Sequence, residues 1–506
     1  MNTKLLRQKI LDLAIRGKLT DQRKSDGSAA DLLKQIVTER VSQNSLNRKK
    51  SIVPKSIIPI NKGDGPFEIP NNWEWIKLGN VCLLNPADKL TDDMEVSFVP
   101  MANIGAGFEN RFISEVRSWN SVKSGFTRFA NGDIAVAKIT PCFENRKSVI
   151  FENLKNGFGA GTTELHILRT FEPVFNKYIF WYVKSEYFIQ NGIGHFSGAV
   201  GQQRVGKDVF FNACLPLPPL AEQQRIVKKI EEAFAEIDAV EKNKELLKNH
   251  IRQTRQKILD LAIHGKLVPQ DANDEPASVL LEKILQEKDQ TDNKKSPKKK
   301  KTDDIATSDN RPYEKITVEN EPFEIPNSWE WVKLGNVCNP IKRGKSPKYA
   351  EKSNVLVFAQ KCNQKNGPIS SEKALYLDET TLSKYPQDEF LQMGDVVINS
   401  TGTGTLGRVG FFNEALPHDV KGIVPDSHVT TIRSSVVNSR YLYYFLKTRQ
   451  PYLEENGEGS TNQKELKPHT IYDLEFPFPP LAEQKRIVDK VEELFKSLDE
   501  ILLHLI

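Results

Sequence analysis

The longest regular pattern in the chain is a heptad repeat of apolar residues over 218–265, with no proline or glycine between Pro219 and Gly265. It predicts one coiled-coil helix of about 45 residues, roughly 65–70 Å long at ~1.5 Å per residue. Pro218 and Pro219 suit the start of a helix, and Gly265 suits a left-handed cap at its end. Nine of the eleven seam positions are apolar: Ile226, Ala233, Val240, Leu247, Thr254 and Leu261 on one seam, and Ile230, Ile237, Lys244, Ile251 and Ile258 on the other.

A second apolar seam at the carboxyl end repeats only the first half of that helix. The missing half matches the amino terminus, where Leu6, Ile10 and Leu13 align with Thr254, Ile258 and Leu261. We therefore expect the two chain ends to meet, so that two antiparallel rods hold two similar domains apart with approximate two-fold symmetry. An ordinary dimerising coiled coil is the alternative. The carboxyl-terminal seam residues are Ile487, Val491, Leu494, Leu498, Ile501 and Leu505.

Three long internal repeats show that the chain is written twice. Residues 66–82 return as 322–338 with 15 of 17 positions identical, and residues 7–19 return as 255–267 with 12 of 13 identical. Residues 216–239 return as 477–500 with 15 of 24 identical. The offsets of 256, 248 and 261 residues exclude a short solenoid repeat.

The order of these repeats predicts the domain organisation. The segments are a half-helix at 1–20, a linker at 21–65, a first large domain at 66–217, the central helix at 218–267, a Lys-rich linker at 268–321, a second large domain at 322–478 and a terminal helix at 479–506. Each linker contains a short helical pattern, AADLLKQIVTERV in one and ASVLLEKILQEK in the other. The run from Lys288 to Lys301 has seven lysines and two aspartates, and we interpret it as a solvated linker rather than a DNA-binding arm.

The two large domains have the pattern of a mixed α/β fold. Each opens with Trp-x-Trp at 73–75 and 329–331, where buried packing is favoured over stacking on bases. A glycine turn then leads into a buried strand, at 131–137 and 393–399. A further strand and an aromatic helix follow, with the helix expected at 177–190 in the first domain and 439–448 in the second. We interpret the glycine run at 157–161 as a tight turn.

Composition sets the class of protein. The 506 residues carry 71 Lys+Arg and 66 Asp+Glu, a net charge of +5, which tolerates a nucleic-acid partner without requiring one. The first large segment, 66–216, has 15 basic and 15 acidic residues, and the second, 322–477, has 18 of each. The five cysteines are scattered singly, which supports neither a disulfide framework nor a zinc site. No secretory signal or long apolar run is present, so we expect a cytoplasmic protein.

No catalytic motif is visible. The glycine loop at 401–407 lacks the GxxxxGK[ST] pattern of a phosphate-binding loop, and no Asn/Asp-Pro-Pro-aromatic motif of an amino-methyltransferase is present. The Asp-x-Lys spacing at 419–421 has its would-be partner Asp426 on the wrong side. We predict a non-catalytic chain without a cofactor or metal of its own.

The PLPPLAEQ-x-RIV and PFPPLAEQ-x-RIV stretches, each after an α/β domain that opens with PFEIP-x-x-WEW, resemble the specificity subunit of type I restriction–modification enzymes. The resemblance spans the chain and implies two target recognition domains, each binding one half of a split, asymmetric DNA sequence. It also implies helices that set the spacing and dock two methylation subunits, with restriction/motor subunits joining one copy of this chain. S-adenosylmethionine, ATP and Mg²⁺ would then bind the partner subunits.

Candidate DNA-contacting residues are Arg, Lys, Asn, Gln and Thr side chains in the polar loops that differ between the two copies, because such groups match base edges in the major groove. For each of them a solvated or turn-stabilising role is about as plausible. In the first domain they are Lys138, Asn145, Arg146, Lys147, Gln202, Gln203 and Arg204; in the second they are Thr401, Thr403, Thr405, Arg408, Asn462, Gln463 and Lys464.

Candidate docking positions are apolar residues of the helical seams. They are Ile226, Ile230, Ile237, Val240, Leu247, Ile251, Ile258, Leu261, Ile487, Val491, Leu494 and Leu498. One alternative function stays open at this point: a coiled-coil adaptor with two protein-binding heads and no role on DNA. The neutral charge of both heads favours it, whereas repeated scaffolds around divergent heads favour DNA recognition.

Overall fold

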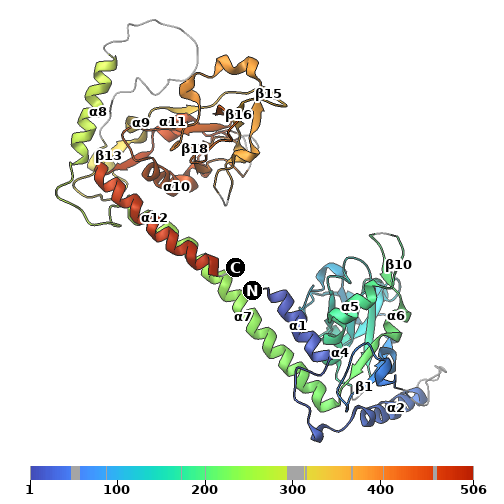
Figure 1. The fold of residues 1–506 in the computed structure, drawn as a ribbon. Helices are drawn as coiled ribbons and strands as arrows, with labels where there is room; N and C mark the ends of the chain where they lie inside the picture. The colour runs from blue at the N-terminus through green and yellow to red at the C-terminus, as the bar shows by residue number, and fades with distance from the viewer. Residues whose placement is uncertain are drawn as a thin grey trace. The chain divides into compact units, whose positions relative to one another are not determined.

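The computed structural model describes residues 2–46, 57, 59–86, 88–171, 174–199, 201–292, 313, 316–365, 368–402, 404–459 and 464–504. These residues form two compact units, Met1–Lys244 and Glu245–Ile506. The boundary falls inside α7 (Leu220–Ile263), which is one unbroken helix of 44 residues (Figure 1). The long helix predicted from the heptad pattern is therefore confirmed. Most of the Lys-rich run at 288–301 lies outside the described residues.

The first unit contains a mixed set of helices and short strands that ends in the first half of α7. Its helices besides α7 are α1 (Thr3–Ile15), α2 (Ala29–Leu46), α3 (Trp119–Val122), α4 (Asn176–Val183), α5 (Glu186–Ile193) and α6 (Lys207–Asn212). Its strands are β1 (Glu74–Lys77), β2 (Cys82–Leu84), β3 (Glu95–Val99), β4 (Glu115–Ser118), β5 (Thr127–Ala130), β6 (Ile134–Ala137), β7 (Ser148–Ile150), β8 (Phe158–Gly161), β9 (Leu165–Thr170), β10 (Phe196–Ser197), β11 (Arg204–Val205) and β12 (Cys214–Leu217).

The second unit begins with the second half of α7 and repeats the same plan. Its other helices are α8 (Ala277–Asp292), α9 (Leu334–Val337), α10 (Ser439–Glu455), α11 (Pro468–Tyr472) and α12 (Leu481–His504). Its strands are β13 (Glu330–Lys333), β14 (Ile341–Arg343), β15 (Tyr349–Ala350), β16 (Val355–Phe358), β17 (Leu375–Leu377), β18 (Val396–Asn399), β19 (Val409–Phe411), β20 (Gly422–Pro425), β21 (Val429–Ile432) and β22 (Glu475–Phe478).

The sheets of the two units correspond. The order β2-β9-β6-β7 in the first unit matches β14-β21-β18-β19 in the second, and all neighbours in both are antiparallel. A second four-stranded sheet in each unit contains one parallel pair, β3 with β8 in one and β16 with β20 in the other. A two-stranded ribbon, β1 with β12 or β13 with β22, joins the entrance of each domain to the strand before its long helix. The predicted mixed α/β class is confirmed.

The buried strand predicted after a glycine turn is present in both units. All four residues of β6 and all four of β18 are buried, which fits a central strand packed on both faces. The turns use Gly132 at φ +84° and Gly394 at φ +95°, a conformation that glycine adopts without strain. The tryptophans at the domain entrances are also buried, with Trp73 and Trp75 at 0% exposure and Trp329 and Trp331 at 4%. Their predicted role in packing is confirmed.

The prediction of a single aromatic helix at 177–190 is wrong in one respect, because this segment forms two helices, α4 and α5. Ser185 interrupts it, since its side chain accepts a hydrogen bond from the backbone N–H of Phe188 and starts a new helix. The preceding Lys184 is fully buried and donates to the carbonyls of Gly107 and Arg146. In the second unit the corresponding α10 is continuous and extends to Glu455, beyond the predicted end at 448.

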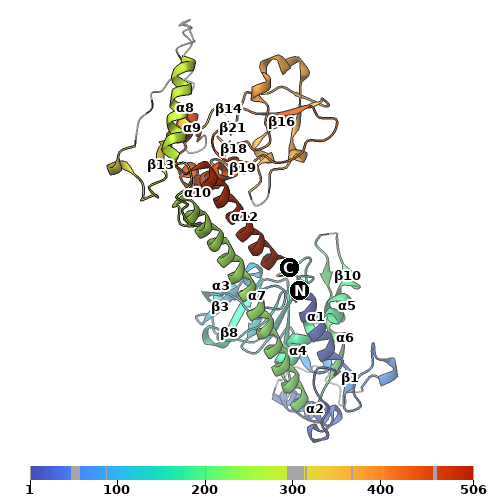
Figure 2. The same cartoon turned by 60° about the vertical axis from the view of Figure 1, so that its left-hand side comes forward.

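Each unit contains an antiparallel pair of helices. In the first, Arg7 of α1 pairs with Asp238 and Glu241 of α7, whereas residues after α1 contact the start of α7 at Glu222. In the second, α12 runs beside α7 (Figure 2). Arg255 of α7 pairs with Asp499 of α12, and residues after α7 contact the start of α12. The two segments predicted to form the second rod are thus both helical, and each packs against the half of α7 in its own unit.

A glycine ends the first helix of each pair. Gly17 and Gly265 both have φ +65°, and the predicted left-handed cap at Gly265 is confirmed. A side chain at either position would collide with the proline ring at 70 or 326, so that the cap also packs against the domain entrance. The linker helices α2 and α8 bury their apolar faces in the same cores, through Leu32, Leu33 and Ile36 in the first unit and Leu281 and Ile284 in the second.

None of the helices in the described part of the chain combines the length and the apolar character needed to cross a lipid bilayer. Within the same residues, no three His, Cys, Asp or Glu side chains gather as metal ligands would.

Candidate nucleic-acid interface

Two polar loops predicted from the sequence lie side by side in the first unit. One, the strand loop (138–147), follows β6, and the other, the hairpin loop (197–207), starts at the last residue of β10 and includes β11, which pairs with β10. The backbone N–H of Thr140 donates to the carbonyl of Gln203 over 3.0 Å, and the N–H of Val205 donates to the carbonyl of Lys138 over 2.9 Å. These backbone bonds join loops about 60 residues apart in sequence into one surface.

The second unit joins its own strand loop (400–408) and hairpin loop (457–467) in the same way. Thr401 and Glu465 form an antiparallel bridge, and the N–H of Leu466 donates to the carbonyl of Ser400 over 2.8 Å. Glu458 and Glu465 exchange two backbone bonds of 2.8 Å and close the hairpin. Thr403, Asn462 and Gln463 lie outside the described residues, so their predicted roles have no structural account.

One residue that was not among the predicted candidates adjoins the paired loops in each unit. The carbonyl of Glu164, just before β9, accepts from the N–H of Lys138 over 3.0 Å. The carbonyl of His428, just before β21, accepts from the N–H of Ser400 over 2.8 Å. Glu164 and His428 therefore occupy equivalent places. Comparing the two copies position by position would have indicated both residues.

The side chain of Arg204 is held by Glu164 in the first unit. Its Nε donates to Oε2 and one terminal nitrogen donates to Oε1, both over 2.9 Å, in a two-point ion pair. The other terminal nitrogen donates to the carbonyl of Gln202 over 2.9 Å. The hydrogen bonds from Arg204 hold the pKa of the Glu164 carboxyl below its usual range. The pair is therefore ionised at neutral pH and has a fixed orientation.

Arg146 is placed differently from the expectation that it reads DNA. Its guanidinium is 7% exposed, donates to the carbonyl of Lys184 over 3.1 Å and pairs with Glu186. Its backbone adopts φ +54°, and its partners Lys184 and Glu186 flank the break between α4 and α5. The guanidinium of Arg146 is therefore engaged inside the domain rather than at the loop surface.

The other candidates of the first unit lie at the surface. Asn145 and Gln202 are exposed, and Lys138, Lys147 and Gln203 are half-buried. The Nζ of Lys147 donates to the carbonyl of Met101 over 3.0 Å.

The side chains of the second unit's strand loop form a network. Thr401 Oγ1 lies 2.7 Å from Nδ1 of His428 and accepts from the amide of Gln360 over 2.6 Å. The hydroxyl of Thr405 donates to the other end of the Gln360 amide over 3.0 Å. Gln360 was not predicted, because it lies on a short turn far from the loop in sequence. Arg408 is half-buried and donates to the carbonyl of Asn363 over 2.8 Å, and Lys464 is exposed.

The charge at one backbone position is reversed between the units. Arg204 and Glu465 both bridge to the strand loop, to Ile139 in one unit and to Thr401 in the other. Arg204 pairs with an acid, Glu164, whereas Glu465 pairs with a base, Arg343. The same backbone therefore presents different hydrogen-bonding groups, which is the chemistry required to distinguish two different base sequences.

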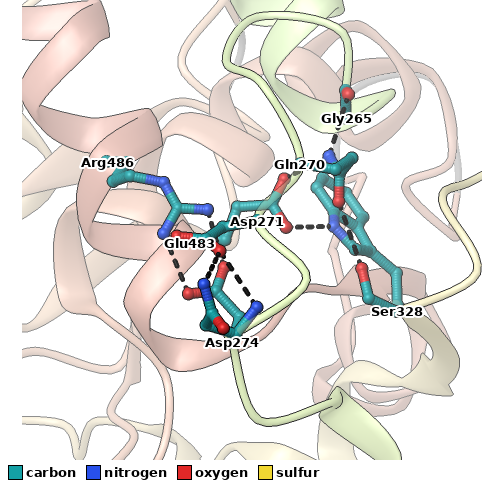
Figure 3. Close-up of polar contacts among 9 residues, drawn as sticks. Gly265, Gln270, Asp271, Asp274, Ser328, Glu483 and Arg486 are labelled. Atoms are coloured by element: carbon teal, nitrogen blue, oxygen red, sulfur yellow. Dashed lines mark hydrogen bonds and ion pairs between the residues drawn. The ribbon is translucent and has the colours of Figure 1, made fainter.

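A second repeated site, the junction, lies where linker, domain entrance and long helix meet (Figure 3). In the second unit, fully buried Glu483 accepts from the indole of Trp329 over 2.8 Å and from Gln270 over 2.6 Å. Beside it, Arg486 donates to both oxygens of Asp274, over 3.0 and 2.6 Å. The junction ties the residues after one helix of the pair to the start of the other.

The first unit has the same junction. Fully buried Glu222 accepts from Trp73 over 2.8 Å and from Gln22 over 2.6 Å, and Arg225 pairs with Asp26. Burial raises the pKa of both glutamic acids, Glu222 and Glu483. The PLAEQ stretch that repeats in the sequence thus supplies a buried carboxylate to each domain entrance.

The predicted docking residues are mostly buried within their own unit. Ile226, Ile230, Ile237, Ile251, Ile258, Ile487 and Val491 are buried, and Leu261, Leu494 and Leu498 are half-buried. Val240 is 48% exposed and Leu247 37% exposed, in the middle part of α7.

Comparison with known proteins agrees with the duplicated architecture. The family model described as "Type I restriction modification DNA specificity domain" matches residues 70–249 and 326–505. The specificity subunit of the type I restriction enzyme EcoAI of Escherichia coli is 34% identical, covering 98% of this chain and 90% of the relative. The EcoEI specificity subunit of Escherichia coli is 32% identical over the same shares.

A solved structure concerning complex assembly and conformational transition of the type I R-M system has the same fold. Its TM-score is 0.58 at 19% sequence identity, covering 87% of this chain and 94% of that one. The family model and the two relatives show that the chain belongs to the family of type I restriction–modification specificity subunits.

Proposed function

We propose that this specificity subunit directs a type I restriction–modification complex to a split DNA sequence, and that each of its two recognition domains binds one half. The observation that carries the proposal is the repeated pair of loops. Both units hold a strand loop and a hairpin loop together by backbone bonds, yet the equivalent side chains differ, with Arg204 and Glu164 in one and Glu465 and His428 in the other. Two different half-sites follow from two different sets of donors and acceptors.

The long helix would set the distance between the half-sites. A helix of 44 residues, at ~1.5 Å per residue, is about 65 Å long. It has no internal proline or glycine, so its length is a fixed quantity. We infer that this length, with α1 and α12 packed along it, defines the spacer.

The chain would act with partners and would perform no chemistry itself. Two methylation subunits would dock on the helices, where Val240 and Leu247 are exposed, and restriction/motor subunits would join one copy of this chain. S-adenosylmethionine, ATP and Mg²⁺ would bind those partner subunits, as the resemblance to the family implies. The relatives are named as specificity subunits of type I restriction enzymes, which supports a role as one part of such a complex.

The deciding experiment maps methylated adenines in the genomes of cells with and without this gene. We expect one bipartite sequence to lose methylation when the gene is removed. Replacing Gln202, Gln203 and Arg204 by alanine should relax one half-site, and replacing Gln360, Arg408 and Lys464 should relax the other. Each contacted base edge contributes about 1–3 kcal/mol of discrimination, so that the loss is measurable.

An adaptor without a DNA role gives the opposite results. It leaves the methylation map unchanged when the gene is removed, and the chain with its methylation subunits then produces no salt-dependent shift of duplex DNA. Methyl transfer by the isolated chain would instead indicate an enzyme.

A further inference from the structure

The surface of the first unit contains an arginine whose donors are only partly used. Arginine has five N–H groups. In Arg204 three of them are engaged, two by Glu164 and one by the carbonyl of Gln202. One N–H on each of the two terminal nitrogens has no partner within the part of the chain that the structure describes.

The exposure of the pair favours the arginine as the contacting partner. The Arg204 side chain is 42% exposed, whereas that of Glu164 is 24% exposed. Lys138 lies close enough to lower the pKa of the Glu164 carboxyl further. The positive charges of Arg204 and Lys138 outweigh the negative charge of Glu164, so these three residues carry a net positive charge. A net positive charge favours approach to the phosphates that line a DNA groove.

The backbone that carries Arg204 is also fixed. The residue pairs with Ser197 across the β10–β11 ribbon and bridges to Ile139 of the strand loop. Its neighbour Val205 is 1% exposed, and the carbonyl of Val205 lies 3.1 Å from the ring nitrogen of buried His166. A side chain held at both its backbone and its guanidinium loses little conformational freedom on binding, which increases its contribution to affinity.

We propose that Arg204 is a guanine-contacting residue of the first domain and that Glu164 is the positioning residue that fixes its guanidinium plane. This inference rests on the proposed function. Two N–H groups on the terminal nitrogens match the two acceptors, O6 and N7, that guanine presents in the major groove. The second domain has Glu465 and His428 at the equivalent places, so it makes no such contact there.

The test uses the chain assembled with its methylation subunits and duplexes that contain the mapped target. Each guanine in turn is replaced by 7-deazaguanine, which lacks the N7 acceptor. With the wild-type chain, we expect one position in one half-site to weaken binding about 5- to 150-fold, the range that corresponds to one base contact. With Arg204→Ala, the same replacement should cause no further loss, because the contact is already absent.

The Glu164→Gln variant tests positioning. It keeps Arg204 but removes the ionised partner, so that the loss caused by 7-deazaguanine at that one position should shrink while losses at all other guanines stay unchanged. A purely structural defect would instead weaken binding at every position. Arg117→Ala is the matched control, since Arg117 is 41% exposed, pairs with Glu115 and lies outside both loops. The guanines of the other half-site report that each variant is folded.

The possible results separate two failures. If Arg204→Ala keeps the wild-type pattern of sensitive guanines, or if no guanine is sensitive, the assignment of Arg204 is wrong while the proposed function stands. If the wild-type complex binds no duplex sequence-specifically and the methylation map does not depend on the gene, the proposed function itself fails.

Discussion

The indole Nε1 of Trp73 donates to the buried carboxylate of Glu222 over 2.8 Å, and Trp329 donates to Glu483 over the same distance in the second unit. Each bond joins a domain entrance to the first turn of a long helix. Because the two partners are about 150 residues apart in sequence, they fix how the domain is attached to its helix. The bond also explains why PLAEQ and WEW repeat together in the chain.

Removing the carboxylate at one junction should loosen that junction alone. Glu222→Ala leaves a buried indole N–H without an acceptor, which costs about 1–3 kcal/mol. Hydrogen exchange should then accelerate in residues 17–27 and 220–226 and stay unchanged in 265–275. Glu483→Ala should give the reverse pattern. Glu222→Gln keeps an acceptor and avoids burying a charge, so it should be milder. If either substitution accelerated hydrogen exchange equally in both units, the expectation that the two junctions are independent would be contradicted.

Removing one side chain of α1 should destabilise the first unit strongly. Leu11 is 0% exposed and packs in the same core as Ile226 and Ile230 of α7. Leu11→Ala should lower the free energy of unfolding by about 2–5 kcal/mol. Leu5→Ala is the control, since Leu5 is 60% exposed.

Deleting residues 1–19 should be more severe than Leu11→Ala and should weaken docking of one methylation subunit. Urea unfolding and the subunit stoichiometry measure both effects, and wild-type values for the deletion would refute this role of α1.

The stability of the first unit should rise between pH 7 and about 10 because of Lys184. Burial of its ammonium lowers the pKa of Lys184 from 10.5 to about 7. In this window the folded chain has lost the proton and the unfolded chain still holds it, so that raising the pH favours folding by up to about 1.4 kcal/mol per pH unit. Urea unfolding at pH 7, 8 and 9 should show a smaller slope for Lys184→Met than for the wild type. Parallel slopes would mean that the lysine keeps its ordinary pKa.

Lengthening α7 should lengthen the DNA spacer. Four helix-forming residues inserted after Lys244 add about 6 Å, close to two base-pair steps of ~3.4 Å. The methylation map should then show the same two half-sites with about two more base pairs between them. Replacing Lys242 and Lys244 by glutamine changes the side chains but not the length, and should leave the spacer as it is. An unchanged spacer after the insertion would exclude α7 as the ruler.

Repetition and periodicity made the scaffold predictable from the sequence. The heptads of α7 and the cap at Gly265 depend on local spacing, and the burial of Trp73 and Trp329 follows from the size of an apolar ring at a domain entrance. The linker patterns likewise correspond to α2 and α8.

Features that depend on distant partners could not be predicted. The glycine run at 157–161, expected to be a turn, is largely strand β8. Glycine is needed in this strand because a side chain at Gly159 or Gly161 would collide with Phe129 or Val99, which are distant in sequence. Arg146 points inward because Lys184 and Glu186, some 40 residues away, provide its partners. The position of Gln360 beside the loop also follows only from tertiary contacts.

The backbone bridges that hold Arg204 to one strand loop and Glu465 to the other affect how such a protein can evolve. Its hydrogen bonds join backbone atoms, so they make no demand on the side chain that projects from the position. For a protein that contacts bases there, one altered codon can exchange a preferred base without refolding the loop. Under the proposed function, two separate recognition domains would let the preference for one target half change while the other stays the same.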